Sequence, residues 1–165
     1  MVWSIERVPS PIGDLTCVSR GASLAALEFP ENGERLTKNL ARLGVTSRDL
    51  TERPGPIGER IQAYFEGDLD ALDGVDVMIA GTEFERRVYA ELRRVRRGDV
   101  VTYSELARRS GSPSAVRAVG ATNAKNPISI VVPCHRVIGA DGSLTGYAGG
   151  LARKRWLLAH EGNVV

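Results

Sequence analysis

Residues 102–124 read TYSELARRSGSPSAVRAVGATNA, and this stretch decides the fold of the second half of the chain. Thr102 and Glu105 have the spacing of a capping box, in which the two side chains cover the first free backbone N–H groups of a helix. The box predicts a short helix that runs to Arg109. Ser110-Gly111 follows and ends that helix, because serine and glycine favour turns over helix interiors.

A second helix is predicted directly after that turn. Ser112 supplies an N-cap and Pro113 a first-turn proline, so the helix should run from Ser114 to about Ala124. Two short helices joined by a glycine-containing turn are the helix-turn-helix pattern. Small residues surround Arg117 on the second helix, which lets its backbone approach either a packed neighbouring helix or a nucleic-acid groove. These small residues are Ala115, Ala118, Gly120, Ala121 and Ala124.

The segments on either side extend this reading. Upstream, Thr82-Glu-Phe-Glu85 is another capping box and predicts a helix. Downstream, Asn126-Pro127 is followed by the β-branched run Ile128–Val132, which is typical of a buried strand. That predicted strand delivers the chain to Cys134. The upstream helix would bury its apolar side chains, namely Phe84, Val88, Ala90, Leu92 and Val95.

The first thirty residues alternate short apolar stretches with turn signals. Strands are predicted at Trp3–Val8, at Leu15–Ser19 and at Leu24–Phe29, with Pro11-Ile-Gly13 and Gly21 between them. Consecutive short strands of this kind form an antiparallel meander.

Helical stretches follow at Glu34–Leu43 and Pro56–Phe65, and residues 68–80 have the character of a connecting segment. We therefore predict an α+β protein of two domains. Residues 1–80 would form a small N-terminal α/β domain with an antiparallel sheet. Residues 81–165 would form a mostly helical domain with a winged helix-turn-helix-like motif.

The composition is that of a globular protein, because 42% of the 165 residues are hydrophobic and 25% are charged. No apolar run approaches the ~18 residues that span a bilayer, and the N-terminus lacks the pattern of a signal peptide, so we expect a cytoplasmic protein without membrane contact. The net charge of +2 does not by itself indicate a polyanionic partner. The basic residues are clustered, however, and such clusters occur both on solvated helix faces and on nucleic-acid-binding surfaces. One group is Arg86, Arg87, Arg93, Arg94, Arg96 and Arg97, and the other is Arg153, Lys154 and Arg155.

Cysteine chemistry is confined to two residues, Cys17 and Cys134, without a C-x-x-C spacing, so we expect no metal site and no cofactor. A cysteine that follows an apolar strand is either an inert buried thiol or a nucleophile. At Cys134, His135 could act as a base and Arg136 adds positive charge, and both favour the reactive thiolate. Side chains alternate along a strand, so His135 reaches Cys134 only through a backbone turn or a bridging water. A third group, such as Glu161, would have to orient the imidazole.

The segment Pro133-Cys-His-Arg-Val-Ile138 resembles the active-site signature of the O6-alkylguanine-DNA alkyltransferases. The likeness covers roughly Gly81 to Gly162 in the family's order, and the first eighty residues resemble the family's more variable first domain. Further matching motifs are Gly98-Asp-Val-Val-Thr-Tyr103, Val116-Arg-Ala-Val-Gly120, Asn126-Pro127, Gly146-Tyr147, Gly149-Gly150 and Trp156-Leu-Leu-Ala-His-Glu-Gly162.

This resemblance implies a DNA repair protein that transfers an alkyl group from O6-alkylguanine in double-stranded DNA to Cys134, once and irreversibly. It implies that His135 is the general base through a water and that Glu161 orients it. Asn126 would hold the loop around the site, and Tyr103 would donate a hydrogen bond to the leaving guanine. No obligate protein partner is expected, and the protein would act as a monomer.

The resemblance also implies how DNA is held. The alkylated nucleotide would leave the stack, Arg117 would fill the vacated space from the minor groove, and Tyr147 would line the pocket. Some members carry a serine where this chain has Ala148, so one hydrogen bond near the base is missing here. The remaining expected DNA or base contacts are Arg136, Ser114, Ala118 and Asn123.

Other functions fit fewer of these residues. A DNA-binding relative that recognises lesions without repairing them would lack the acceptor, so Cys134 argues against that class. A cysteine hydrolase would use the same Cys-His-Glu set but would leave Tyr103 and Arg117 unexplained. A combined transcription factor and repair protein would need a further metal-dependent methyl-accepting domain, for which 165 residues leave no room.

Overall fold

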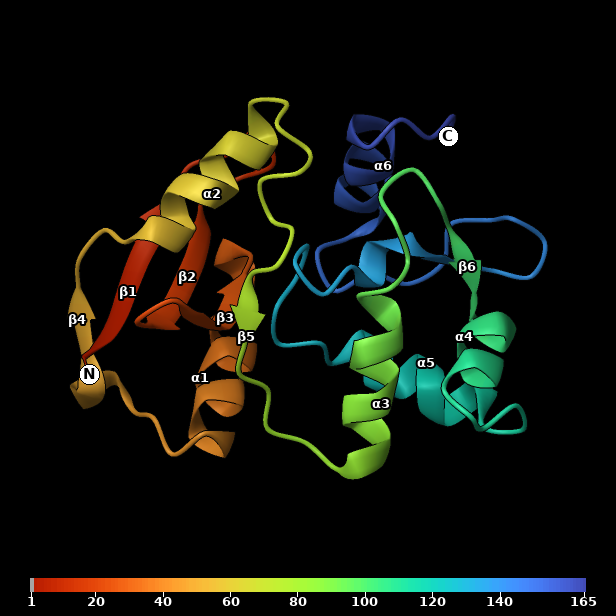
Figure 1. Ribbon diagram of the computed structural model, residues 1–165, viewed down its shortest axis with the longest axis horizontal. Coiled ribbons are helices and arrows are strands. Elements are labelled where there is room, and N and C mark those ends of the chain that lie inside the picture. Colours follow the sequence, from red (N-terminus) through yellow and green to blue (C-terminus); the bar gives the residue numbers. More distant parts are fainter. Residues whose placement is uncertain (1) are drawn as a thin grey trace. The chain divides into compact units, whose positions relative to one another are not determined.

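The computed structural model describes residues 2–165, and the chain forms two compact units, one ending at Ala80 and the other spanning Gly81–Val165 (Figure 1). Within the described residues, no helix is long and apolar enough to cross a membrane. Each unit has its own set of buried apolar residues.

The first unit is built on a five-stranded sheet with the order β4-β1-β2-β3-β5. Its centre is the predicted antiparallel meander, formed by β1 (Trp3–Val8), β2 (Leu15–Arg20) and β3 (Ser23–Glu28). Two short strands extend it in parallel, β4 (Leu50–Glu52) beside β1 and β5 (Asp76–Val77) beside β3. The antiparallel core of the sheet is as predicted, but the two parallel edge strands were not foreseen, because two- and three-residue strands carry too little periodicity to be recognised.

Two helices pack against this sheet, α1 (Gly33–Arg42) and α2 (Pro56–Phe65), close to their predicted bounds (Figure 1). Short 3-10 turns precede α1 at Pro30–Asn32 and β4 at Ser47–Asp49. Apolar side chains of the sheet, of α1 and of the loop after it form one cluster. The buried members of that cluster are Val18, Ala25, Ala26, Leu40 and Val45.

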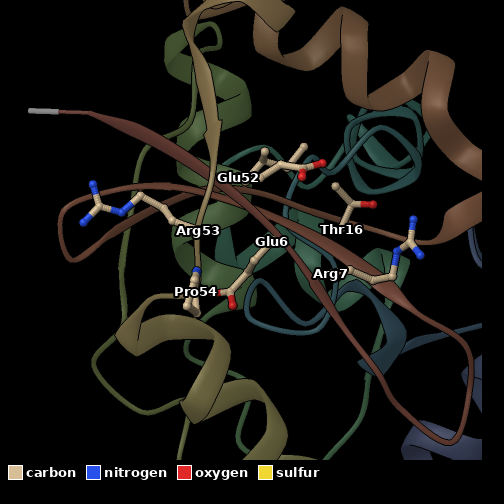
Figure 2. A pocket seen from close by; sticks show the side chains of 7 residues that line it. Glu6, Arg7, Thr16, Glu52, Arg53 and Pro54 are labelled. Atoms are coloured by element: carbon tan, nitrogen blue, oxygen red, sulfur yellow. The ribbon is translucent and has the colours of Figure 1, made fainter.

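The N-terminus of α2 docks on β1 through a carboxylate. Glu6 accepts hydrogen bonds from the backbone N–H groups of Gly55 and Gly58, two of the donors that a helix start leaves unpaired. Figure 2 shows the Glu6 side chain directed toward Pro54, just before the helix. A Cβ atom at Gly58 would collide with the Glu6 carboxylate in its present position, so a larger residue there would displace this contact.

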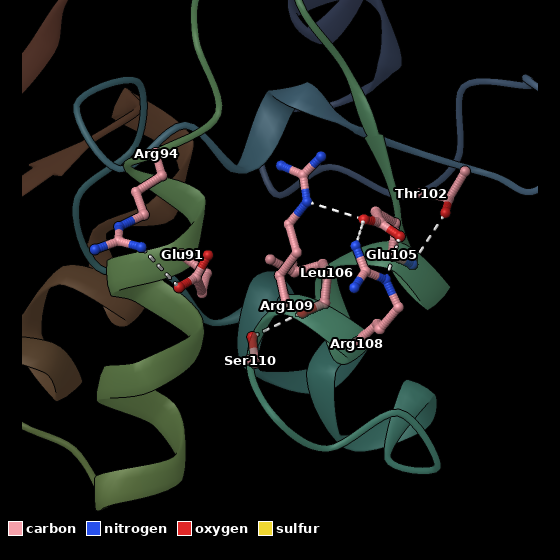
Figure 3. Close-up of polar contacts among 8 residues, drawn as sticks. All are labelled: Glu91, Arg94, Thr102, Glu105, Leu106, Arg108, Arg109 and Ser110. Atoms are coloured by element: carbon pink, nitrogen blue, oxygen red, sulfur yellow. Dashed lines mark hydrogen bonds and ion pairs between the residues drawn. The ribbon is translucent and has the colours of Figure 1, made fainter.

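In the second unit, α3 (Glu83–Leu92) begins with the predicted capping box. Thr82 accepts from Glu85 N at 3.1 Å, and the Glu85 carboxylate accepts from Thr82 N at 2.9 Å. Helix α4 (Tyr103–Arg109) begins with only half of its box, because Thr102 accepts from Glu105 N. The Glu105 carboxylate instead binds the guanidinium groups of Arg108 and Arg109 (Figure 3).

Helix α5 (Val116–Ala124) starts two residues later than predicted. Ser112 and Pro113 were expected to open it, but the chain first makes a turn in which Ala115 N donates to Ser112 O at 2.9 Å. Ala115 is then the N-cap. The helix packs against α3 and α4, and Tyr89 Oη donates to Thr122 O at 3.0 Å.

The predicted strand Ile128–Val132 is absent, although every residue in it is buried. Tight turns replace it, since Val132 N donates to Ile128 O at 3.1 Å. A 3-10 turn follows at Cys134–Arg136, and β7 (Val137–Ile138) then pairs in parallel with β6 (Val101–Thr102). The chain ends with α6 (Leu151–His160).

Candidate active site

Cys134 lies at the start of the 3-10 turn and is only 3% exposed. Asn126 holds the segment that leads to it. The Asn126 Nδ2 group donates to Val132 O at 2.7 Å, and its Oδ1 accepts from Ile128 N at 3.0 Å. Since Asn126 is itself 1% exposed, these bonds are shielded from water and fix the turns before the cysteine.

His135 and Glu161 form a buried pair beside the cysteine. His135 Nε2 lies 3.0 Å from Glu161 Oε1, and both side chains are inaccessible to solvent. Arg136 grips the same carboxylate, with Nε 2.8 Å from Oε1 and Nη2 2.8 Å from Oε2. Arg136 Nη1 also donates to Val95 O at 2.6 Å. Arg136 therefore holds the Glu161 carboxylate in position, and that carboxylate in turn orients the imidazole ring of His135.

The protonation states of this pair follow from its surroundings. Burial lowers the pKa of His135 below its ordinary value, despite the opposing influence of Glu161, so the imidazole is neutral at pH 7. Burial alone would raise the pKa of Glu161, but hydrogen bonds from Arg136 and His135 outweigh it and hold that pKa well below its usual range.

The tautomer of His135 can be assigned from these contacts. An ionised carboxylate only accepts hydrogen bonds, so His135 Nε2 carries the proton and donates it to Glu161. Nδ1 is then the basic nitrogen, and it is buried without a hydrogen-bond partner among the described residues. A neutral imidazole with one oriented, unprotonated nitrogen is suited to accept a proton from a nearby thiol, directly or through a water.

Lys154 is a component of the site that sequence reasoning missed. It was grouped with two surface arginines, yet it is 0% exposed, and its ammonium donates to Val137 O and to Thr145 O at 2.6 Å each. Burial lowers its pKa to about 8, and its electrostatic interaction with Cys134 acts in the opposite direction. The same interaction favours the thiolate of Cys134.

Tyr103 and Tyr147 lie on separate segments of this unit and are both half-buried. The Tyr103 hydroxyl, at the start of α4, accepts a hydrogen bond from Thr145 Oγ1 at 3.4 Å. Gly120 of α5 lies against the Tyr103 ring, because a Cβ there would be 3.8 Å from it. Tyr147 and its half-buried neighbour Ala148 belong to the loop between β7 and α6.

The exposed side of α5 carries Arg117 and Ala118, and Ser114 is exposed in the turn before it. Asn123 does not share that surface. It is 5% exposed and faces the interior, which argues against the DNA contact expected for it, because a helix position four residues after the buried Val119 falls on the same face. Lys125, just after the helix, forms an ion pair with Glu85 at 2.5 Å.

The first group of arginines, for which a solvated helix face and a nucleic-acid surface were both open, is spread over α3 and the loop after it. Arg86, Arg87, Arg94 and Arg96 are exposed, whereas Arg93 and Arg97 are half-buried. Arg87 pairs with Glu83, so a local acid offsets part of this charge. Arg94 pairs with Glu91 in the same way (Figure 3).

Comparison with known families finds a match over most of the second unit. The model described as "6-O-methylguanine DNA methyltransferase, DNA binding domain" matches residues 83–163. A protein of Shigella flexneri named methylated-DNA–protein-cysteine methyltransferase is 44% identical over 161 residues, which cover 95% of this chain and 94% of that protein. A protein of the same name from Mycolicibacterium paratuberculosis is 45% identical over 159 residues, which cover 94% of this chain and 90% of that protein.

Solved structures extend the similarity to the whole chain. Mycobacterium tuberculosis OGT in complex with DNA superposes with a TM-score of 0.81 at 39% identity, covering 96% of this chain and 92% of that one. The O6-methylguanine-DNA methyltransferase of Pyrococcus kodakaraensis gives a TM-score of 0.76 at 30% identity, covering 98% and 100%. The α+β architecture is therefore shared with known members over both units.

Proposed function

Because this chain belongs to the methylated-DNA–protein-cysteine methyltransferase family, we propose that it moves the alkyl group of O6-alkylguanine in DNA onto Cys134 Sγ and is consumed in doing so. The broader activity, DNA repair by alkyl transfer, follows from the family. A monomer that works in the cytoplasm without a protein partner remains a prediction of the sequence.

The observation that carries this proposal is the buried array of His135 and Glu161 next to Cys134, with Nε2 to Oε1 at 3.0 Å. His135 Nδ1 takes the thiol proton through a water, and Glu161 stabilises the imidazolium that forms. The positive charge of Lys154 favours the thiolate in the same step. Sγ then attacks the alkyl carbon, so an S–C bond forms as the C–O6 bond breaks.

The electron pair of the broken bond goes to the guanine, which needs a proton or a hydrogen bond at that moment. Tyr103 is suited to supply it, because its oxygen accepts from Thr145 and its own hydrogen is left to donate. The product at Cys134 is a thioether, which cellular thiols do not cleave. One protein molecule therefore repairs one lesion.

DNA would be held by a winged helix-turn-helix formed by α4 and α5, with the β6–β7 pair as its wing. The packing of α4 on both α5 and β6 supports this reading. The exposed Arg117, with Ala118 beside it and Ser114 just before the helix, is suited to enter the minor groove and to fill the space of a flipped nucleotide. Tyr147 and Ala148 are proposed to border the base pocket. The contact with the base that was expected for Arg136 is disfavoured, because its guanidinium binds Glu161 and Val95 O.

The test of the central claim is the mass of the intact protein after incubation with duplex DNA that contains O6-methylguanine. We expect one added methyl group per molecule, located on the peptide that contains Cys134, in a reaction that stops at one equivalent. An unchanged protein mass, or sustained turnover beyond one equivalent, would contradict the proposal.

The flipping role of Arg117 has a separate test that compares two substrates. Arg117→Ala should slow repair of duplex DNA at least tenfold but leave the reaction with free O6-benzylguanine within about twofold, because a free base needs no extrusion. Arg155→Ala, which removes an exposed arginine of α6, is the matched control. Equal losses on both substrates would rule out a role in flipping.

A further inference from the structure

Ile130 has a backbone conformation unlike that of any other non-glycine residue among residues 2–165. Its φ is +74°, in the left-handed region, whereas the other positive values belong to glycines. A β-branched residue is rarely found there, since its Cβ crowds the backbone. Ile130 is also 2% exposed, so packing holds it in place.

The hydrogen bonds around Ile130 define the strained feature. Val131 N donates to Ser129 O at 2.8 Å, a bond that spans only three residues and, with this φ, marks the rare γ-turn of positive φ. Val132 N returns to Ile128 O at 3.1 Å. The chain thus reverses within the β-branched run that its sequence favours as a strand.

A second γ-turn lies directly after it and presents the cysteine. Cys134 N donates to Val132 O at 2.8 Å around Pro133, whose φ of −83° and ψ of 65° are those of the relaxed inverse form. Val132 O also accepts from Asn126 Nδ2 at 2.7 Å. One carbonyl therefore links the strained turn, the buried asparagine and the backbone of Cys134.

Strained backbone persists only where its surroundings over-determine it, and here they do. Ile128 and Val132 are both 0% exposed on either side of Ile130, and Asn126 bonds to both ends of the segment. We propose that Ile130 is a positioning residue, whose strained γ-turn sets the direction in which Cys134 Sγ meets the alkyl carbon and His135. The inference rests on the alkyl transfer proposed above.

Two substitutions separate strain from packing. Ile130→Ala and Ile130→Gly both remove the buried side chain, but only glycine relieves the left-handed strain. We expect Ile130→Gly to melt a few degrees higher than Ile130→Ala, because glycine adopts this φ freely. Ile130→Gly should nevertheless transfer the methyl group about tenfold more slowly than Ile130→Ala, because glycine no longer confines the turn to one conformation. Ile130→Val keeps the β-branch and should stay within about twofold of the unmodified protein.

The measurement is the single-turnover transfer rate at saturating protein, together with the DNA dissociation constant, which should not change. The pH midpoint for iodoacetamide labelling of Cys134, read by peptide mass, should shift in Ile130→Gly relative to Ile130→Ala. Transfer by Ile130→Gly as fast as by Ile130→Ala, or an identical pH midpoint, would overturn the inference.

The test remains decisive if the glycine variant misfolds or if the unmodified protein transfers no methyl group. Should Ile130→Gly fail to fold by circular dichroism, Ile130→Asn takes its place, because asparagine also tolerates the left-handed region. If the unmodified protein transfers no methyl group, the proposed function fails, while the labelling midpoint still decides whether Ile130 positions the thiol.

Discussion

The two units each bury one cysteine, and the two thiols differ in their neighbours rather than in their exposure. Cys17 lies in the middle of β2 at 1% exposure and Cys134 in the 3-10 turn at 3%. Burial raises the pKa of Cys17 to about 12, and the carboxylate of Glu6, its partner across the β1–β2 pair, adds to that shift. Cys134 has a basic imidazole and a buried ammonium nearby.

This comparison separates two effects that are easily confused. Burial keeps both thiols dry, which by itself favours the neutral form. The neighbouring groups then distinguish the two thiols, because the ammonium and the imidazole near Cys134 favour a thiolate, whereas the carboxylate near Cys17 adds a smaller contribution to the raised pKa that burial causes. The difference teaches that a reactive cysteine is recognised from the charged groups that face it and not from its accessibility.

Exchanging each cysteine is the most severe test of this contrast. Cys134→Ser should abolish methyl transfer while DNA that carries the lesion is still bound, since a serine hydroxyl is a far weaker nucleophile. Cys17→Ser, the matched control, should transfer at the rate of the unmodified protein if it folds. Intact mass after reaction distinguishes the two, and an adduct in Cys134→Ser would refute the assignment of the acceptor.

Removing the charge of Glu161 should produce the next largest effect. Glu161→Gln keeps the shape of the side chain but weakens the orientation of His135, so transfer should fall about 10²-fold, within the range of acid–base contributions. Glu83→Gln changes an exposed acid, with 85% of its side chain accessible, and should leave the rate unchanged. Rapid-quench kinetics measures both.

The same substitution has a signature in stability. The pKa of Glu161 is lower in the folded protein than its ordinary value of 4.5, so its contacts contribute stability that is complete above about pH 4.5 and is lost as the pH falls through the folded-state value. Urea unfolding at pH 7, 4.5 and 3.5 should show a smaller decline for Glu161→Gln than for the unmodified protein. An identical decline would mean that another group titrates.

Substitution of Lys154 should lower the transfer rate less than substitution of Glu161, and the adjacent Arg155 provides a matched control. Lys154→Met removes the ammonium that favours the thiolate, so a smaller fraction of Cys134 is in the reactive form and transfer should slow by about tenfold. The melting temperature should also drop by several degrees, because buried backbone carbonyls lose their donor. Arg155→Met lies on the exposed side of the same helix and should change neither property. A Lys154→Met variant with unaltered rate would remove the cation from the mechanism.

The sequence predicted the elements whose signals are local. The capping box at Thr82 determined the start of α3, and apolar alternation located the three central strands of the first unit. The Ile128–Val132 run was misassigned because its β-branched composition favours a strand. Asn126 instead supplies hydrogen bonds from its side chain to both ends of that run, which a composition argument does not capture.

Two errors of placement had a signal that could have corrected them. Lys154 precedes the buried Leu157 and Leu158 by three and four residues, so it belongs to the inner face of α6. Asn123 follows the buried Val119 by four residues in the same way. Helical periodicity outweighs the polarity of a single residue. The carbonyl partners of Lys154, in contrast, lie outside α6, in β7 and in the loop before the helix, so the periodicity of the helix does not predict them.

The smallest expected effect comes from the other cysteine. Glu6→Gln removes the negative charge beside Cys17, but burial is the larger cause of its raised pKa, so iodoacetamide labelling of Cys17 should change less than about twofold at pH 8. Peptide mass spectrometry should find Cys134 labelled far faster in both proteins. Loss of a full carboxylate acceptor at Gly55 and Gly58 should cost about 1 kcal/mol of stability. Labelling of Cys17 at the rate of Cys134 would show that the carboxylate, and not burial, keeps this thiol inert.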